Sequence, residues 1–328
     1  MTDREWISRG ALPHPAPPSP NLALAGGEFL AAGLQRISLE QLDYAVAALT
    51  GMRIDIGIHE ARKSLRRVRA VLRLVRDPLG DRTYRAENVA LRDAGRFIGG
   101  SRDATVMVET VSGLAFLYRD LLVPGAFDVL RSHLLERDKL IRRRVSGERI
   151  DEVVLALTGA RERFAAWPSR QGTSGTLDEG FSTVEAGIRR VYRRGRNRMA
   201  DAYLEETPEA FHVWRKRVRY LRFQTTLLEG MWPGMQRGIV KDLAYLADAL
   251  GAEHDLAELY RLLDEEPEML PDENARHLLQ GLLLRNRTRL QAAAHPVGAR
   301  LYAEAPRAFT QRLGTYWEAW RPATGQVG

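Results

Sequence analysis

Two segments of the chain carry a histidine followed by a row of cations spaced three and four residues apart. The rows match at an offset of 153 residues and are His59, Arg62, Lys63, Arg66 and Arg69, then His212, Arg215, Lys216, Arg219 and Arg222. Residues at this spacing share one face of an α-helix. Guanidinium groups bind phosphate oxygens in pairs and stay charged at physiological pH. The two rows therefore predict two cationic stripes suited to a phosphate-containing polyanion.

The histidines open the stripes near the expected helix N-termini, where backbone amides also favour an anion. Neighbouring cations should lower the pKa of each imidazole, so a neutral ring that donates one N–H to phosphate is expected. The competing interpretation is a histidine that only packs or caps. No metal site is predicted, because the positions four residues on are Lys63 and Lys216.

A second matched pair lies downstream, where Gly99 and Asp103 correspond to Gly251 and Asp255 at an offset of 152 residues. We expect a turn between helices at each glycine, with the aspartate capping a helix or holding a cation of the stripe. Neither aspartate has a partner carboxylate or an evident nucleophile nearby. Since strings typical of P-loops, serine hydrolases and zinc proteases are also missing, we predict no catalytic residues and no enzyme.

The first stripe continues to Arg73, which places it over about 21 Å at ~1.5 Å per residue. Further cations proposed for the same site are Arg142, Arg189, Arg193, Arg196, Arg285 and Arg289. If the repeated helices pack side by side, their stripes would face a shared groove or pore. The alternative is two solvated helix faces. Solvated faces usually alternate Glu with Arg, and each such pair stabilises the helix by ~0.2–0.5 kcal/mol. Neither of the two stripes shows this alternation.

The length and composition of the chain limit the kinds of fold that can carry these helices. The chain has 328 residues, 45% of them hydrophobic, and 49 Lys and Arg against 42 Asp and Glu. Residues 251–273 hold nine acids and one arginine. The net charge of +7 therefore arises from acidic and basic residues that are concentrated in different segments of the chain. The length favours two domains.

Cysteine is absent, which excludes disulfides and thiolate chemistry and fits a reducing cytoplasm. No apolar run approaches the roughly 18 residues of a membrane span, and residues 1–21 lack an apolar signal core. We therefore expect a cytoplasmic protein without a membrane partner or a cofactor.

Apolar residues recur at spacings of three and four, which predicts an all-α fold. The proline-rich residues 1–28 are expected to form a disordered tail, and residues 167–177 have the composition of a linker. These boundaries place an N-terminal helical bundle at 29–166 and a C-terminal bundle at 178–322. Gly251 and Pro296 are among the residues expected to separate helices. Duplication of one helical unit explains the length, the linker and the repeat together.

At these residues the sequence resembles the CHAD family, the conserved histidine α-helical domain. The resemblance rests on residues 59–74, LRDAGRFIGGSRD at 91–103, VYRRGRNRM at 191–199, FHVWRKRVRYLRF at 211–223 and LADALGAEHD at 246–255. It implies two pseudo-symmetric four-helix bundles around a basic central pore that binds inorganic polyphosphate without hydrolysing it. The family's Arg-Asp pair falls on Arg102 and Asp103, but the second half has His254 before Asp255, which leaves the role of His254 open.

The resemblance implies a stand-alone binding protein, because the ExExK string of a fused triphosphate tunnel enzyme is missing. Association with polyphosphate granules is the expected location. One alternative is a nucleic-acid-binding helical protein, since the same stripes would release counterions from DNA or RNA and so favour its binding. The other is a phosphotransferase in which His59 or His212 becomes phosphorylated.

Overall fold

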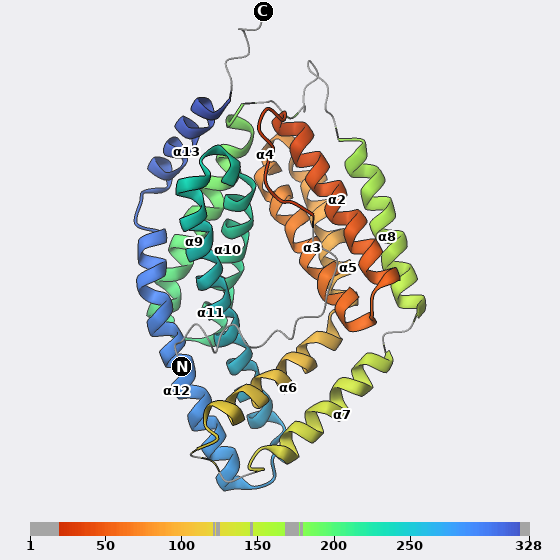
Figure 1. The fold of residues 1–328 in the computed structure, drawn as a ribbon, viewed down its shortest axis with the longest axis vertical. Coiled ribbons are helices and arrows are strands. Elements are labelled where there is room, and N and C mark those ends of the chain that lie inside the picture. The colour runs from red at the N-terminus through yellow and green to blue at the C-terminus, as the bar shows by residue number, and fades with distance from the viewer. Residues whose placement is uncertain are drawn as a thin grey trace, which may run out of the picture.

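The computed structural model describes residues 20–120, 122, 125–144, 147–167, 177 and 180–321, with side chains described except at 100–104 and 141–144. It confirms the all-α prediction: the described residues form helices and no strand (Figure 1). The first half contains α2 (Leu30–Gly51), α3 (Ile54–Leu74), α4 (Arg76–Leu79), α5 (Asp81–Phe97), α6 (Gly100–Leu117), α7 (Asp128–Arg144) and α8 (Gly147–Ala165). The second contains α9 (Ser182–Glu205), α10 (Pro208–Leu227), η1 (Glu229–Met231), α11 (Pro233–Glu265), η2 (Pro267–Met269), α12 (Glu273–Leu301) and α13 (Pro306–Trp320).

The order of helices repeats along the chain. The starts of α2, α3 and α5 at Leu30, Ile54 and Asp81 have counterparts in the starts of α9, α10 and α11. Within this order the two cationic stripes fall on α3 and α10, as predicted. The pseudo-twofold symmetry of the halves stays a prediction.

Local sequence explains why α10 begins where it does. The hydroxyl of Thr207 accepts a hydrogen bond of 3.2 Å from the backbone N–H of Ala210, and Pro208 occupies the first helical turn. A proline there costs no hydrogen bond, because that N–H has no partner inside the helix. The apolar face of α10 is buried through Trp214, Val218 and Leu221, so its cationic face turns outward from the core.

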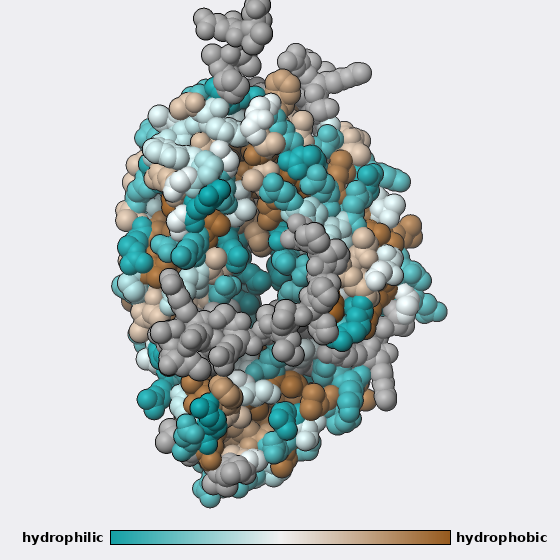
Figure 2. All heavy atoms as spheres, in the orientation of Figure 1, coloured by the Kyte–Doolittle hydropathy of each residue, from teal (hydrophilic) through white to brown (hydrophobic). Residues whose placement is uncertain are grey.

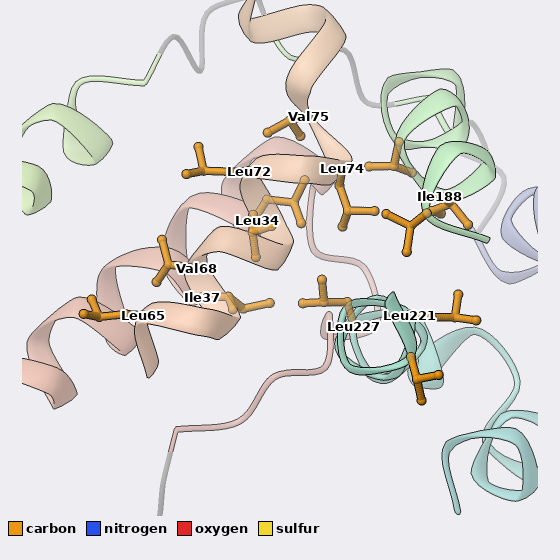
Figure 3. Close-up of a cluster of buried hydrophobic side chains, with 14 of the residues drawn as sticks. Leu34, Ile37, Leu65, Val68, Leu72, Leu74, Val75, Ile188, Leu221 and Leu227 are labelled. Atoms are coloured by element: carbon orange, nitrogen blue, oxygen red, sulfur yellow. The ribbon is translucent and has the colours of Figure 1, made fainter. Parts of the chain in front are cut away.

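The larger hydrophobic core joins the two halves. It contains the inner faces of α2, α3, α5 and α8 together with α9 and α10. Figure 3 shows Leu74 at the end of α3 beside Ile188 of α9. Close to this point the side-chain amide of Gln224 on α10 donates a hydrogen bond of 3.2 Å to the carbonyl of Ala70 on α3. The two stripe-bearing helices are therefore fixed to each other at their C-terminal halves.

A second, separate core lies at the end of the molecule where α6 and α7 meet the far ends of α11 and α12 (Figure 1). It includes Leu114 of α6, Leu134 of α7, Leu259 of α11 and Leu283 of α12. Both cores thus combine residues from the two predicted bundles. Most of the predicted linker, 167–177, lies outside the described residues, and the bundle boundaries stay a prediction.

Two expectations about chain breaks were wrong. Gly251 and Pro296 lie inside α11 and α12 instead of between helices. A single glycine costs a helix only ~1 kcal/mol relative to alanine, which the burial of neighbours such as Leu250 and Leu256 outweighs.

The expected tail also differs in part. Residues 1–19 lie outside the described residues, but residues 20–28 are placed. Leu24 is buried, and its N–H donates a 3.0 Å hydrogen bond to the carbonyl of Leu227. The apolar side chain of Leu24 gains more from the core than from solvent.

Candidate functional site

The helices that carry the two stripes, α3 and α10, lie on the two sides of a hollow in the molecule. In Figure 1, α3 and α5 flank one side and α10 and α11 the other, and Figure 2 shows hydrophilic walls around the hollow. Burial, followed by the charges of Arg62 and then of Arg215, lowers the pKa of Arg66 to about 10. Arg66 and Arg215 belong to different halves of the chain. Cations of the two stripes are therefore close enough to repel each other.

The two helices meet where the first stripe ends. The guanidinium carbon of Arg73 lies 3.9 Å from the centroid of the Tyr220 ring, a cation–π contact between α3 and α10. Arg69, one turn earlier, donates a 3.1 Å hydrogen bond to the side-chain oxygen of Asn88. Both partners are uncharged, so they hold these arginines without neutralising them.

Each of the matched glycines lies beside one arginine of a stripe. In the first half, a guanidinium nitrogen of Arg62 donates to the carbonyl of Gly99. In the second, a Cβ added at Gly251 would lie 3.7 Å from a guanidinium nitrogen of Arg215. The repeat found in the sequence is thus a repeated contact in space. Gly99 lies between α5 and α6, as expected of a turn, whereas Gly251 was wrongly interpreted as a turn because it lies inside α11.

His212 and His254 form a pair at the N-terminal end of the second stripe. Their Nδ1 atoms are 3.2 Å apart, so one ring donates an N–H and the other accepts it. Burial, followed by the charge of Lys216, lowers the pKa of His212 to about 4. Burial, followed by the charge of Arg215, lowers the pKa of His254 to about 3. The direction agrees with the expected neutral imidazole at His212, although burial contributes more than the neighbouring cations, and His254 is its hydrogen-bond partner.

The first half is built differently at the equivalent place. His59 Nε2 lies 3.5 Å from a carboxylate oxygen of Glu60. Arg102 stands where the second half has His254, and the side chains of Arg102 and Asp103 lie outside those described. The prediction for Asp103 is therefore untested. Asp255 was expected at a helix cap but is half-buried inside α11, so it caps no helix.

Carboxylates contact both stripes. Glu60 is buried and lies 3.2 Å from the Lys63 ammonium, and Asp248 of α11 lies 3.7 Å from Arg222. Burial raises the pKa of Asp248 even though Arg222 opposes this effect. Sequence reasoning missed both acids, since Glu60 stands just before the acid-free segment and Asp248 on a different helix.

The remaining predicted cations do not all reach the hollow. Arg189, Arg193 and Arg196 lie on the side of α9 opposite to Gly187, the residue that contacts α3. Arg285 and Arg289 are exposed on the face of α12 opposite to its buried leucines, and α12 packs on the outer side of α11 (Figure 1). These five residues were wrongly included in the shared groove, because a run of arginines does not reveal which face each one occupies. The side chain of Arg142 lies outside those described.

Two other cations, Arg67 and Arg217, were missed, whereas Arg194 belongs to the arginine-rich segment 191–199 that the sequence singled out. Arg67 is buried and donates a 3.1 Å hydrogen bond to Gln41, while its guanidinium lies 6.0 Å from the Phe223 ring centroid of α10. Arg194 and Arg217 lie near the end of the first stripe, since charges on α3 and α4 lower their pKa values after burial does. A helical projection centred on the apolar faces of α3 and α10 would have found Arg67 and Arg217.

The structure also bears on other kinds of site. Within the described ranges, His, Cys, Asp and Glu do not gather in groups of three that could hold a metal ion. No described helix is both long and apolar enough to cross a lipid bilayer.

Comparisons with known proteins agree with this architecture. A family model described as "CHAD domain" matches residues 36–264. The crystal structure of the CHAD domain from the plant Ricinus communis is similar to this chain with a TM-score of 0.64 and 19% sequence identity. The similarity covers 89% of this chain and 99% of that one, and at this identity it concerns the fold. No curated protein sequence matches significantly.

Proposed function

Because this chain belongs to the CHAD family, we propose that it binds inorganic polyphosphate in the hollow between α3 and α10. The observation that carries the proposal is the approach of like charges from the two stripes. The charge of Arg215 on α10 reaches Arg66 on α3, in a place where burial already disfavours a cation. Such an arrangement costs stability unless an anion enters between the cations.

A phosphate chain matches the spacing of donors along the site. Each stripe offers a cation at about every helical turn, and guanidinium groups grip phosphate oxygens through two parallel hydrogen bonds. A linear polyanion can follow both stripes at once, whereas a single phosphate would meet only one or two of their side chains. The regular stripes therefore favour a long phosphate polymer over a small phosphorylated metabolite.

The histidine pair supports binding in a different way from the arginines. Neutral imidazoles add no repulsion to the stripe, and the ring nitrogens not used in the 3.2 Å contact can donate to or accept from a bound chain. We propose no chemical step on the phosphate. Phosphoryl transfer to His212 is the outcome that would turn the binding site into an enzyme.

The proposed cellular role follows from the ligand. A protein that holds polyphosphate without consuming it would associate with cytoplasmic polyphosphate granules and influence their growth. Nucleic acid is the competing ligand, because duplex and single strands would release counterions on the same stripes.

A competition titration tests the proposal. The protein is saturated with fluorescent long-chain polyphosphate at physiological salt, and duplex or single-stranded nucleic acid is added at equal phosphate concentration. We expect little displacement by nucleic acid and full displacement by unlabelled polyphosphate. Effective displacement by nucleic acid would overturn the proposal, and a gain of one phosphoryl group in the protein's mass would favour the phosphotransferase.

Variants locate the site. Arg219→Glu on the second stripe should weaken polyphosphate binding far more than Arg307→Glu, which reverses the same charge on the exposed face of α13. The pair changes net charge equally, so a general electrostatic effect predicts equal losses. Equal losses would show that the stripes are not the binding site.

A further inference from the structure

The first stripe does not end at a neutral surface. Beyond Arg73 lie two further arginines, Arg194 of α9 and Arg217 of α10, and we name these three residues the three-arginine cluster. The charges of Arg194 and Arg73 both act on Arg217. One guanidinium thus comes from each of three helices, and the cluster begins where α3 and α10 cross.

Close packing of α9 on α3 brings the cluster together. A Cβ added at Gly187 of α9 would collide with the backbone of Leu74 and Arg73, so only glycine permits this approach. Nearby, a guanidinium nitrogen of Arg190 lies 2.6 Å from both carboxylate oxygens of Asp77 on α4. The contact places the next turn of α9, which carries Arg194, beside the end of α3.

The cluster differs from its surroundings in charge balance. Two nearby arginines do pair with an acid, Arg76 with Asp81 at 2.8 Å and Arg198 with Asp201 at 2.7 Å. Among the described residues, no carboxylate pairs with Arg73, Arg194 or Arg217.

The unbalanced charge is also partly buried. The Nε atom of Arg217 is buried and meets no hydrogen-bond partner among the described residues. Burial lowers the pKa values of both Arg194 and Arg217, and neighbouring arginines lower them further. A buried donor without a partner destabilises the folded protein, and an anion bound beside it would supply the missing acceptor.

Tyr220 connects the cluster to the hollow. Its ring supports Arg73 on one side. Its side chain also lies within electrostatic range of Arg66 and Arg69 of the first stripe and of Arg217 of the cluster. An anionic chain that follows the first stripe to its end therefore meets the cluster next.

We propose that Arg73, Arg194 and Arg217 form a second phosphate-binding site, which takes the continuation of the same polyphosphate chain past Tyr220. The inference rests on the proposed function of the hollow. It adds a dependence on chain length, because a short polyphosphate fills the hollow alone and a longer one occupies both places.

A matched pair of double variants tests the inference. Arg194→Gln with Arg217→Gln removes two charges of the cluster, and Arg193→Gln with Arg196→Gln removes two charges from the far side of α9. The affinity of each protein is measured against a series of polyphosphates of increasing length. We expect the cluster variant to match the natural protein for short chains and to bind long chains about tenfold or more weakly, as the loss of two charge-assisted contacts requires. The control should follow the natural protein at every length.

The results separate the two proposals. If the natural protein binds no polyphosphate, the proposed function fails. If it binds long chains and the cluster variant binds them as tightly as the control, the inference fails and the proposed function stands. Because Arg194 is exposed, Arg194→Gln alone tests the cluster without disturbing the interior, with an expected loss confined to long chains.

Discussion

Replacing Arg66 by methionine should stabilise the folded protein and weaken its binding of polyphosphate. Methionine keeps an unbranched, flexible stem and removes the charged guanidinium group. The pKa of Arg66 falls from its ordinary value to about 10, chiefly through burial. Each pKa unit corresponds to about 1.36 kcal/mol, so the charged form destabilises the fold by roughly 3 kcal/mol at most. Water in the hollow and local relaxation reduce this figure, and we expect Arg66→Met to gain about 1–2 kcal/mol.

The sign of the effect follows from protonation. A cation whose pKa is lowered by folding destabilises the protein in full at every pH below its folded pKa, and the penalty begins to decline only above about pH 10. The gain from Arg66→Met should therefore be complete at neutral pH. Replacing buried charges by apolar side chains of similar size has this general direction.

Urea unfolding at pH 7 measures the gain as a higher midpoint at an unchanged slope. Arg82→Met on the exposed surface of α5 is the control and should leave the midpoint unchanged. In the same experiment, long-chain polyphosphate should raise the midpoint of the natural protein much more than that of Arg66→Met. A variant that is less stable than the natural protein, yet binds equally well, would refute the reasoning about the hollow.

Three further predictions address other parts of the site. Gly187→Ala should destabilise the protein by about 1–3 kcal/mol because its Cβ meets backbone, whereas Gly251→Ala, with only a guanidinium tip nearby, should cost nothing in urea unfolding; equal effects would contradict the close-approach argument. Stability should fall as pH drops below 6.5 towards 4, because unfolded histidines take up protons that the buried pair does not, and His254→Gln should flatten this slope; an unchanged slope would argue against the pair. The logarithm of polyphosphate affinity should fall linearly with the logarithm of salt concentration, and Arg219→Gln should reduce that slope by about one; a slope that does not change would place Arg219 outside the contact.

Much of the fold could be predicted from local pattern. The apolar faces of α3 and α10 and their cationic stripes follow from the 3.6-residue period. The offset between His59 and His212 identified the repeated unit. These features depend on residues close in sequence, where periodicity is informative.

Features that depend on distant residues escaped prediction. The side of α9 that packs on α3 decides that Arg194 approaches the stripe and Arg193 does not. Likewise, the buried side of α12 removes Arg285 from the site. Gly251 provides a contact for Arg215, yet in the sequence it is indistinguishable from a helix break. Each of these outcomes depends on packing between helices, and a single helix pattern carries no information about its neighbours.

The arrangement of the cores also affects how the chain folds during synthesis. Residues such as Leu114 and Leu134 emerge from the ribosome early, but their partners Leu259 and Leu283 follow more than a hundred residues later. The larger core likewise awaits α9 and α10. A nascent chain that stops before residue 180 would therefore expose apolar surface and depend on chaperones, although duplicated domains usually complete one copy before the next.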